Sequence, residues 1–558
     1  MSSSLKPNPS PAFPGGGYFK KNVLIIFPLL ILGAFFIIPV LSIFRHISFT
    51  GILESIKNDY YRNVISFTFL QAAVSTLAAV ALGLPGAWIM SHINFRGRRL
   101  VSSITTVPFV LPSVLVVLGF VLCFGNSGIL NSFIMKITSA EKPPLKILYS
   151  FKAIILAHTF YNFPIALRLI SAAWRQIGNS RIEAAEILGA GRTRIFFTVI
   201  LPSLLPSIIA AGSLIFIFCF MSFAVILVLG GGPAFSTLEV EIYRLARISL
   251  DIDSAASLAL LGALLTALFT WIYIRLQKRA SASIRAEKAH PLSKFSKLPA
   301  RSRVFTIIYL LIILLLIIGP LAAVVYRSFQ HRSGWSGNLA FTFKQYTDLF
   351  AGESSTAAIF TSVIIAFAAV LISLPAGFTA AYVIVRGRLT FSGLVETLFM
   401  LPMGVSAIVI GLGYYSLFTL LPEGFSNKGL LIVFAHSVIA LPFVVRTFTT
   451  GIRAIKGSLI EASHTLGEGH LGTLLRVELP LLKGSIISAA AFAFCISAGE
   501  INAVLILSDG TTPTIPISIY RLISSYQFFG ACAMGTVLML ICGIAFYLID
   551  HYGGDEIF

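Results

Sequence analysis

Charged side chains are scarce in this sequence. Only 11% of its 558 residues are Asp, Glu, Lys or Arg, and 57% are apolar, whereas an average soluble domain carries about 25% charged residues. This composition argues against a water-soluble fold and favours a protein embedded in the lipid bilayer. A net charge of +19 would suggest nucleic acid in a soluble protein, but basic residues gather in the cytoplasmic loops of membrane proteins. We therefore expect no nucleic-acid partner.

The sequence also lacks the motifs of catalysis and nucleotide binding. It has no G-x-x-x-x-G-K-[ST] phosphate loop, and the dipeptide Gly-Lys does not occur in it. No nucleophile stands with a base, and no cluster has the spacing of metal ligands. We expect no cofactor, no metal and no enzymatic activity, so any ATP must be hydrolysed by another protein. The five cysteines lie inside apolar runs, as small packing residues do: Cys123, Cys219, Cys495, Cys532 and Cys542.

Long apolar runs dominate the sequence. A helix needs roughly 20 mostly apolar residues to cross a bilayer, and twelve such stretches can be placed, which predicts an all-α polytopic membrane protein. Each half of the chain holds six of them. They run near 22–44, 64–90, 101–124, 151–174, 204–229 and 252–275, then near 305–328, 356–385, 393–420, 428–450, 484–507 and 528–549.

The polar segments between these stretches predict the domain organisation. With the N-terminus inside the cell, the basic loops fall on the cytoplasmic side, as the positive-inside rule requires. Both termini are then cytoplasmic, and the protein is expected in a bacterial inner membrane as a multi-pass chain. The expected parts are a disordered tail at 1–21, a first transmembrane domain at 22–275, a basic cytoplasmic linker at 276–304, a second transmembrane domain at 305–550 and a C-terminal tail at 551–558.

The two halves repeat each other. Because each half has an even number of spans, both copies enter the bilayer in the same orientation, and the repeat is parallel with a pseudo-twofold axis along the membrane normal. The repeat is visible as residue pairs that differ by 278 in number: His158, Pro164, Arg168, Arg175, Glu183, Ala184, Gly189, Leu201 and Pro202 recur as His436, Pro442, Arg446, Arg453, Glu461, Ala462, Gly467, Leu479 and Pro480.

One motif stands in the loop between spans four and five of each half. It combines a Glu-Ala start, a glycine six residues after the Glu and a Leu-Pro pair further on. Glu-Ala-Ala favours a short helix that another protein can approach closely, Gly ends it, and Pro suits the first turn of the next helix. The motif residues are Glu183, Ala184, Ala185, Gly189, Leu201 and Pro202 in the first half and Glu461, Ala462, Ser463, Gly467, Leu479 and Pro480 in the second.

This motif resembles the EAA loop of importer permeases of the ATP-binding-cassette superfamily. The resemblance implies two parallel six-helix repeats of the type I importer permease. It also implies that the two loops are coupling helices, each held by one of two copies of a cytoplasmic ATPase, and that an extracytoplasmic solute-binding protein delivers the solute. One fused chain would then serve each transporter. The sequence departs from the motif at Ser463, which replaces the second Ala, and at Val199 and Val477, which replace the usual Ile.

Further residues resemble the thiamine and thiamine-phosphate importer permeases. They are the segments His158-Thr159-Phe160-Tyr161-Asn162-Phe163-Pro164, Gly230-Gly231-Gly232-Pro233 and Thr237-Leu238-Glu239. Ferric-iron permeases share the fused layout, so iron is the alternative solute, with polyamines and other small solutes behind it. An ion-gradient carrier is a more distant alternative, because such a carrier has no reason to keep two EAA loops.

Glu500 is a carboxylate inside the eleventh apolar stretch. A charged group within a membrane is costly and is by default functional, so Glu500 is a candidate for lining the solute path, together with Asn502 and with Ser222, which stands 278 residues before Glu500. The alternative is a hydrogen bond to a neighbouring helix. His158 and His436 are interpreted as structural, and Arg168 and Arg446 as anchors at the cytoplasmic helix ends. Four acidic residues are expected in an external loop: Glu239, Glu241, Asp251 and Asp253.

Overall fold

The structure is a computed structural model, and it is helical almost throughout. It describes the chain apart from residues 1–17, 48, 106–107, 109–110, 178, 284–291, 333–338, 388–390, 421, 423–426, 509, 511 and 553–558. Two short strand pairs complete the described part. Strand β1 (Ile93–Asn94) runs parallel to β2 (Ser293–Lys294), and β3 (Gln330–Arg332) runs antiparallel to β4 (Leu339–Phe341).

The first half is built from long helices joined by short ones. In lipid the backbone must satisfy its own hydrogen bonds, so apolar runs of this length become helices. The elements are α1 (Tyr18–Leu32), α2 (Ile38–Ser42), α3 (Phe49–Lys57), α4 (Asp59–His92), α5 (Arg98–Ile104), α7 (Ser113–Phe124), α8 (Ile129–Thr138), α9 (Phe151–Arg175), α10 (Asn179–Ile187), α11 (Arg192–Ile195), α12 (Leu201–Phe220), α13 (Ala224–Leu229), α14 (Leu238–Tyr243) and α15 (Ile252–Ser283).

The second half repeats this order. Its helices are α16 (Ala300–Ser328), α17 (Lys344–Ala351), α18 (Glu353–Arg386), α19 (Ser392–Met400), α20 (Ala407–Phe418), α21 (Lys428–Ala454), α22 (Gly457–Thr465), α23 (His470–Thr473), α24 (Leu479–Leu481), α25 (Lys483–Gly499), α26 (Asn502–Leu507), α27 (Ile515–Ser524) and α28 (Phe528–Tyr552). The expected tails at 1–21 and 551–558 lie largely outside the described residues, and the helices α1 and α28 extend into them.

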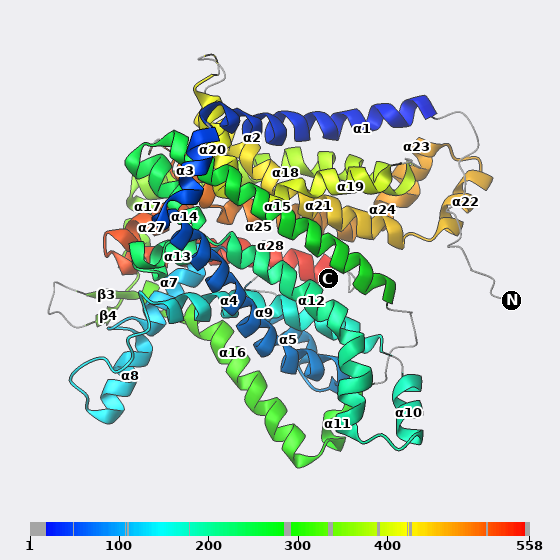
Figure 1. The fold of residues 1–558 in the computed structure, drawn as a ribbon, viewed down its shortest axis with the longest axis horizontal. Helices are drawn as coiled ribbons and strands as arrows, with labels where there is room; N and C mark the ends of the chain where they lie inside the picture. The colour runs from blue at the N-terminus through cyan, green and yellow to red at the C-terminus, as the bar shows by residue number, and fades with distance from the viewer. Residues whose placement is uncertain are drawn as a thin grey trace.

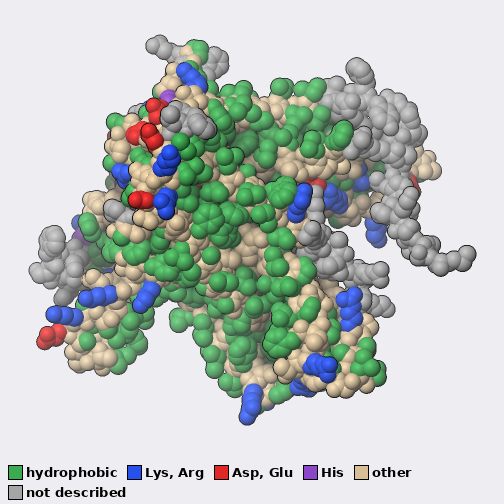
Figure 2. Space-filling view, viewed as in Figure 1, with side chains coloured by type: hydrophobic (Ala, Val, Ile, Leu, Met, Phe, Trp, Pro, Cys, Tyr) green, Lys and Arg blue, Asp and Glu red, His purple; other side chains and the backbone are tan. Residues whose placement is uncertain are grey.

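The all-α membrane fold predicted from the sequence is confirmed. Among the described residues, ten helices are long and apolar enough to cross a membrane, and two bent helix pairs raise the number to twelve if each pair counts as one span. Figure 2 shows hydrophobic side chains over the middle of the molecule, with Lys and Arg side chains toward its two ends. This distribution is that of a protein whose middle lies in hydrocarbon.

Four of the twelve predicted stretches are not single straight helices. The stretch 101–124 is divided into α5 and α7, and 393–420 is bent by 88° between α19 and α20. Prolines explain both breaks, because Pro112 immediately precedes α7 and Pro402 lies in the 3₁₀ turn before α20. The stretches 204–229 and 484–507 are each interrupted near their ends. There a short helix, α13 or α26, follows α12 or α25 after a break.

The first helices of the two halves are exchanged. α1 packs against α18, and α2 against α20, of the second half, while α16 packs against α7 of the first half (Figure 1). A hydrogen bond also joins each first helix to the opposite half: Tyr414 Oη of α20 donates to Phe35 O over 2.7 Å, and Tyr309 Oη of α16 donates to Leu82 O of α4 over 2.8 Å. Each half therefore completes the helix bundle of the other.

Glycines make this exchange sterically feasible. A Cβ atom built on Gly413 of α20 would lie 2.5 Å from Pro39 O, and one on Gly119 of α7 would lie 2.8 Å from Pro320 Cβ. Pro39 belongs to the first membrane helix of one half and Pro320 to that of the other. Small residues let membrane helices approach closely, and here the same Pro-on-Gly contact occurs twice.

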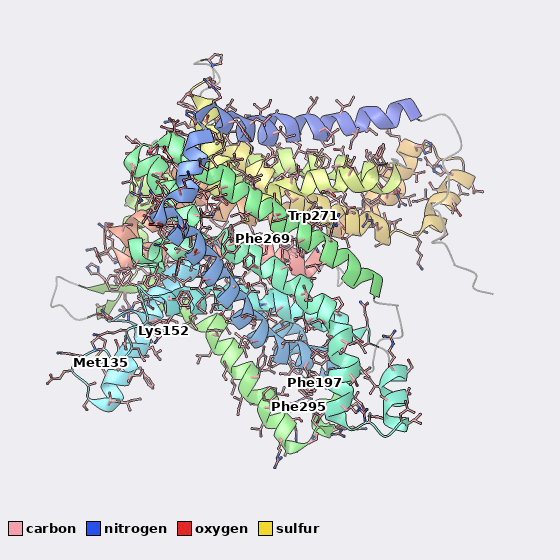
Figure 3. The ribbon with its side chains drawn as sticks, in the orientation of Figure 1. Met135, Lys152, Phe197, Phe269, Trp271 and Phe295 are labelled. Atoms are coloured by element: carbon pink, nitrogen blue, oxygen red, sulfur yellow. The ribbon has the colours of Figure 1, made fainter. Side chains whose placement is uncertain are left out.

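The ends of the molecule differ in structure. α10 and α22 both lie at the right-hand end in Figure 1, while α8, α17 and the β3–β4 pair lie at the opposite end. Phe197, on the π-helical turn Phe196–Ile200, and Phe295 are seen at the bottom of the view in Figure 3, and Phe269 and Trp271 lie midway along the molecule on α15. Phe269 packs edge-on against Phe216 with ring centroids 4.8 Å apart.

Candidate functional site

The two EAA loops form short helices that project from one end of the fold. α10 holds Glu183, Ala184 and Ala185, and α22 holds Glu461, Ala462 and Ser463. Gly189 and Gly467 follow these helices with φ of +78° and +89°, the left-handed conformation that glycine adopts at a helix C-terminus without steric cost. The helix and glycine stop expected at each motif are therefore present.

Apolar side chains at the tips of these helices face outward. Ile187, Leu188 and Leu466 are 85%, 87% and 85% exposed. These side chains are therefore accessible to a contact with another protein. Ile460 is instead buried, so the second helix uses that side chain to pack on its own loop.

The departure from the motif at Ser463 is compensated inside the fold. Its hydroxyl lies 3.0 Å from Thr473 Oγ1, and both side chains are buried. In the first half the residues 278 positions earlier are Ala185 and Ile195, and Ile195 is buried as well. A hydrogen-bonded polar pair in one copy thus replaces an apolar pair in the other, which keeps buried polar atoms satisfied.

The Leu-Pro pairs begin the next helices through a π-helical turn. In both halves this turn ends directly before Leu-Pro, at Ile200 in the first and at Glu478 in the second. Pro202 and Pro480 lie in the first turn that follows. Proline clashes with the carbonyl four residues earlier, and the wider π turn accommodates that ring. After Pro480 the chain bends by 69° into α25.

A buried ion pair ties the second loop to the membrane domain. Arg386 Nε, at the end of α18, donates to Glu478 Oε1 over 3.1 Å, and the two side chains are 11% and 3% exposed. Arg386 Nη2 also donates to Ile452 O. The first half has Ile200 in place of Glu478. The segment Arg96-Gly97 recurs as Arg386-Gly387 at an offset of 290 residues, and Arg96 is exposed. The two EAA loops are therefore held by different forces.

The residues expected on the solute path lie around one cavity. A cavity of about 280 Å³ is lined by both halves, at the breaks between α12 and α13 and between α25 and α26, and Ser222, Glu500 and Asn502 all line it. Ser222 and Glu500 each stand immediately before the residue that caps the short helix. They occupy equivalent positions about the pseudo-twofold axis, and such discontinuous helices form the binding sites of several transporter folds.

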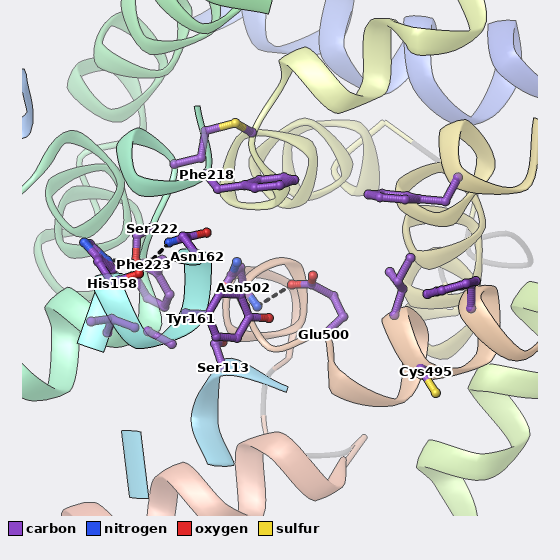
Figure 4. A pocket seen from close by; sticks show the side chains of 16 residues that line it. Ser113, His158, Tyr161, Asn162, Phe218, Ser222, Phe223, Cys495, Glu500 and Asn502 are labelled. Carbon is purple, nitrogen blue, oxygen red and sulfur yellow. Dashed lines mark hydrogen bonds between the residues drawn. The ribbon is translucent and has the colours of Figure 1, made fainter. Parts of the chain in front are cut away.

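Glu500 is anchored by one of its two oxygens. Oε1 accepts hydrogen bonds from Asn502 N over 2.5 Å and from Ala503 N over 3.1 Å, so the carboxylate caps α26. The described residues that line the cavity around the carboxylate include no Lys or Arg. Figure 4 shows the carboxylate within the cavity, with Asn502 and Tyr161 beside it. Its hydrogen bonds to the backbone of α26 are those of a helix cap, and its place on the cavity wall keeps Glu500 a candidate for the solute path.

The two repeated histidines are held by serines. His158 Nδ1 lies 3.1 Å from Ser75 Oγ and Nε2 lies 2.8 Å from Ser222 Oγ, while His436 Nδ1 lies 2.8 Å from Ser497 Oγ. Both side chains are buried. These partners agree with a structural role for both histidines, although His158 also forms part of the cavity wall.

The arginine anchors behave differently in the two halves. Arg446 is exposed, as an anchor at the membrane surface should be. Arg168 instead turns inward and donates from Nη2 to Ser102 O over 3.1 Å, so it joins α9 to α5 rather than reaching the lipid surface.

The expected external loop of four acidic residues is corrected by the structure. Asp251 and Asp253 are exposed, but Glu239 and Glu241 lie on α14 and are 1% and 0% exposed. Glu241 is ion-paired with Arg244, at 2.5 Å between Oε1 and Nη2, and accepts from Tyr60 Oη. Burial raises the pKa of Glu239 to about 8, so that carboxyl is mostly neutral at neutral pH. A count of charges could not show that α14 is packed against other helices.

Aromatic side chains of the cavity were not identified from the sequence. Phe218, Phe223, Phe443 and Phe492 line it from both halves, together with Tyr161, whose Oη donates to Leu111 O. The sequence contains 47 phenylalanines, and hydropathy does not separate those that face a cavity from those that face lipid. Only Tyr161 carried a signal, through the segment around His158. Among the described residues no group of three or more His, Cys, Asp or Glu could hold a metal ion.

Comparison with known proteins identifies the family of both halves. The family of binding-protein-dependent transport system inner membrane components matches residues 79–285 and 373–552. The thiamine transport system permease protein of Brucella abortus (strain 2308) is 27% identical over 499 residues, which are 88% of this chain and 88% of that protein. The same permease of Escherichia coli (strain K12) is 26% identical, covering 90% and 91%. The ferric transport system permease protein of Actinobacillus pleuropneumoniae is 25% identical, covering 94% and 77%.

Proposed function

This chain belongs to the family of binding-protein-dependent transport system inner membrane components, and from that membership we propose that it carries thiamine or its phosphates across the membrane. It is a multi-pass membrane protein and the permease subunit of an ATP-binding-cassette importer. The observation that carries the solute proposal is the similarity to thiamine transport system permeases over 88% to 90% of the chain.

The energy for transport would come from a separate ATPase. We propose that α10 and α22 each contact one of two ATPase copies, through the motif residues of each loop and the exposed tips Ile187, Leu188 and Leu466. This proposal is supported by the position of both helices at one end of the molecule. Closure of the ATPase pair would move the two helices, and the helices that follow them would switch the access of the cavity.

The orientation of the chain in the membrane follows from the proposed contact with the ATPase. If α10 and α22 face the ATPase, their end of the molecule is cytoplasmic, and so is the N-terminal end of α1, which lies there too (Figure 1). An extracytoplasmic binding protein would then deliver the solute at the end that carries α8 and α17. Since both halves are present in one chain, one copy would serve each transporter.

The solute path is proposed to pass through the cavity between the halves. Ser222, Glu500 and Asn502 line it at the two equivalent helix breaks. The support is geometric, because the cavity lies where the pseudo-twofold repeat places its two discontinuous helices together.

The proposal is tested by reconstituting the chain in lipid with its ATPase and binding protein. Hydrolysis is measured with the binding protein loaded with thiamine, with thiamine phosphates or with ferric ion. We expect stimulation by thiamine or its phosphates, and loss of that stimulation when Glu183 and Glu461 are both replaced by Ala. Failure of any ATPase to bind the chain would contradict the coupling proposal.

Ferric ion is the second candidate solute, because a ferric transport system permease is also similar over most of the chain. Stimulation by ferric ion alone would replace thiamine as the solute and leave the permease function standing. An ion-gradient carrier is not retained, since the family matches both halves.

A further inference from the structure

The cavity between the halves combines one carboxylate with several aromatic rings. Glu500 is its acidic residue, and its 16 lining residues include no Lys or Arg. Four phenylalanines line it, two from each half: Phe218 and Phe223, Phe443 and Phe492. Its volume of about 280 Å³ lies near the lower end of ligand sites, which span roughly 300–1,000 Å³, so the cavity suits a small solute.

The charge of Glu500 is held in place but is not neutralised by a partner side chain. Oε1 accepts hydrogen bonds from the backbone of Asn502 and Ala503, and the described residues of the cavity lining supply no Lys or Arg to pair with the charge. A carboxylate without a cationic partner inside a membrane protein is unfavourable. A cation beside Oε2 would relieve that cost, and the aromatic faces would add cation–π attraction.

We propose that this cavity is a transit site for a small aromatic cation, with Glu500 Oε2 as its counter-ion and phenylalanine rings from both halves against its faces. The assignment rests on the proposed function, because thiamine is a small aromatic cation whose thiazolium ring carries one positive charge. It goes further by naming the residues that recognise the solute within the membrane.

The site requires both halves at once. Glu500 and two of the phenylalanines come from the second half, while Tyr161, Phe218 and Phe223 come from the first. A movement that separates the halves would draw Phe218 and Phe223 away from the carboxylate. Binding and release of the cation would thus follow from the same rearrangement that changes access to the cavity.

The first experiment compares thiamine with its neutral thiophene isostere, 3-deazathiamine, which has nearly the same shape and no permanent charge. Uptake of each is measured in proteoliposomes that contain the whole transporter, with wild-type chain or Glu500→Gln. The same binding protein delivers the solute to the wild-type chain and to the variant. Its own preference for one of the two solutes therefore cancels when the two chains are compared. Glutamine keeps an oxygen that can cap α26, and hence the fold.

We expect Glu500→Gln to lower thiamine uptake about tenfold, the effect of losing roughly 1.4 kcal/mol of cation attraction, and to leave uptake of the isostere unchanged. Phe443→Leu should lower thiamine uptake by a smaller factor. Glu353→Gln removes one carboxylate at an exposed position at the start of α18. It should change the uptake of neither thiamine nor the isostere. An equal loss for both solutes, or no loss, would overturn the assignment of Glu500.

A second measurement separates this inference from the proposed function. Thermal unfolding of the purified chain in lipid nanodiscs is followed with millimolar thiamine or 3-deazathiamine, without ATPase or binding protein. We expect thiamine to raise Tm more than the isostere, and Glu500→Gln to abolish the difference. If wild-type vesicles take up no thiamine, the proposed function fails while this readout still tests the site. If thiamine does not raise the Tm of the wild-type chain more than the isostere does, the proposed cation site is refuted.

Discussion

At the scale of single residues, the two copies of the repeat have diverged in linked positions. Ser463 and Thr473 bond to each other where the first half has Ala185 and Ile195. Glu478 likewise pairs with Arg386, whereas the first half has Ile200. In each case the polar residue of the second half has a polar partner, because an unpaired buried polar group would be costly.

The Arg386–Glu478 pair gives a direct prediction. Glu478→Ile introduces the residue of the first half and leaves the guanidinium of Arg386 buried without its counter-ion. We expect the free energy of unfolding to fall by about 3–5 kcal/mol, seen as a lower Tm in lipid nanodiscs. The double variant Arg386→Met with Glu478→Ile should recover most of the loss, since an apolar pair can replace a buried ion pair.

The control for this prediction is a second ion pair of the same half. Arg453 and Glu396 lie 3.5 Å apart, with side chains 57% and 38% exposed. Exposed pairs contribute about 0–1 kcal/mol, so Glu396→Gln should barely move the Tm. Equal Tm shifts for Glu478→Ile and Glu396→Gln would show that burial of the Arg386 pair does not matter.

At the scale of elements, hydropathy predicted where the chain enters the membrane but not where its helices break. The stretches 101–124 and 393–420 are mostly apolar, and their breaks lie at Pro112 and Pro402. Proline alone is no sufficient signal, because Pro164 and Pro442 lie inside unbroken helices. A proline leaves the helix unbroken when neighbouring segments satisfy the backbone groups that it frees. The presence of such neighbours is a property of the tertiary structure.

The glycine stops of the coupling helices carry the second prediction. Gly189→Val and Gly467→Val place a β-branched residue at positive φ, which costs about 1–3 kcal/mol and redirects the chain after each helix. We expect the double variant to keep its insertion and basal ATPase binding but to lose most of the solute-stimulated hydrolysis. ATPase assays on reconstituted transporter measure this.

Gly191 provides the matched control in the same loop. It has an ordinary φ of −68°, and a Cβ on it would meet no atom within 4 Å. Gly191→Ala should therefore leave stimulated hydrolysis unchanged. Retention of full stimulation in the Gly189 and Gly467 double variant would mean that the direction of these loops is unimportant for coupling.

At the scale of the whole molecule, the exchange of first helices makes the two halves interdependent. Gly119 and Gly413 admit Pro320 and Pro39 at equivalent contacts. We expect Gly119→Val or Gly413→Val to push a first helix away from the opposite half and to cost about 1–3 kcal/mol through overpacking. Thermal unfolding and uptake assays should both report the loss.

Gly319, the neighbour of Pro320 on α16, is the control for these substitutions. A Cβ there meets no atom within 4 Å, so Gly319→Ala should be neutral or slightly stabilising. If Gly119→Val and Gly413→Val have the same small effect as Gly319→Ala, then the close approach of the halves does not contribute to stability.

The sequence by itself determined the class of fold and the duplication, because apolar length and residue spacing are properties of the chain alone, and the coupling role of the two EAA motifs stays a proposal. Its three candidate path residues stay a proposal, although the structure places Ser222, Glu500 and Asn502 around one cavity. Only the tertiary structure decided the exchange of first helices, the burial of Glu239 and Glu241, and which phenylalanines face that cavity. Each of these depends on which surfaces meet across hundreds of residues, and a pattern of hydropathy contains no information about partners so far apart.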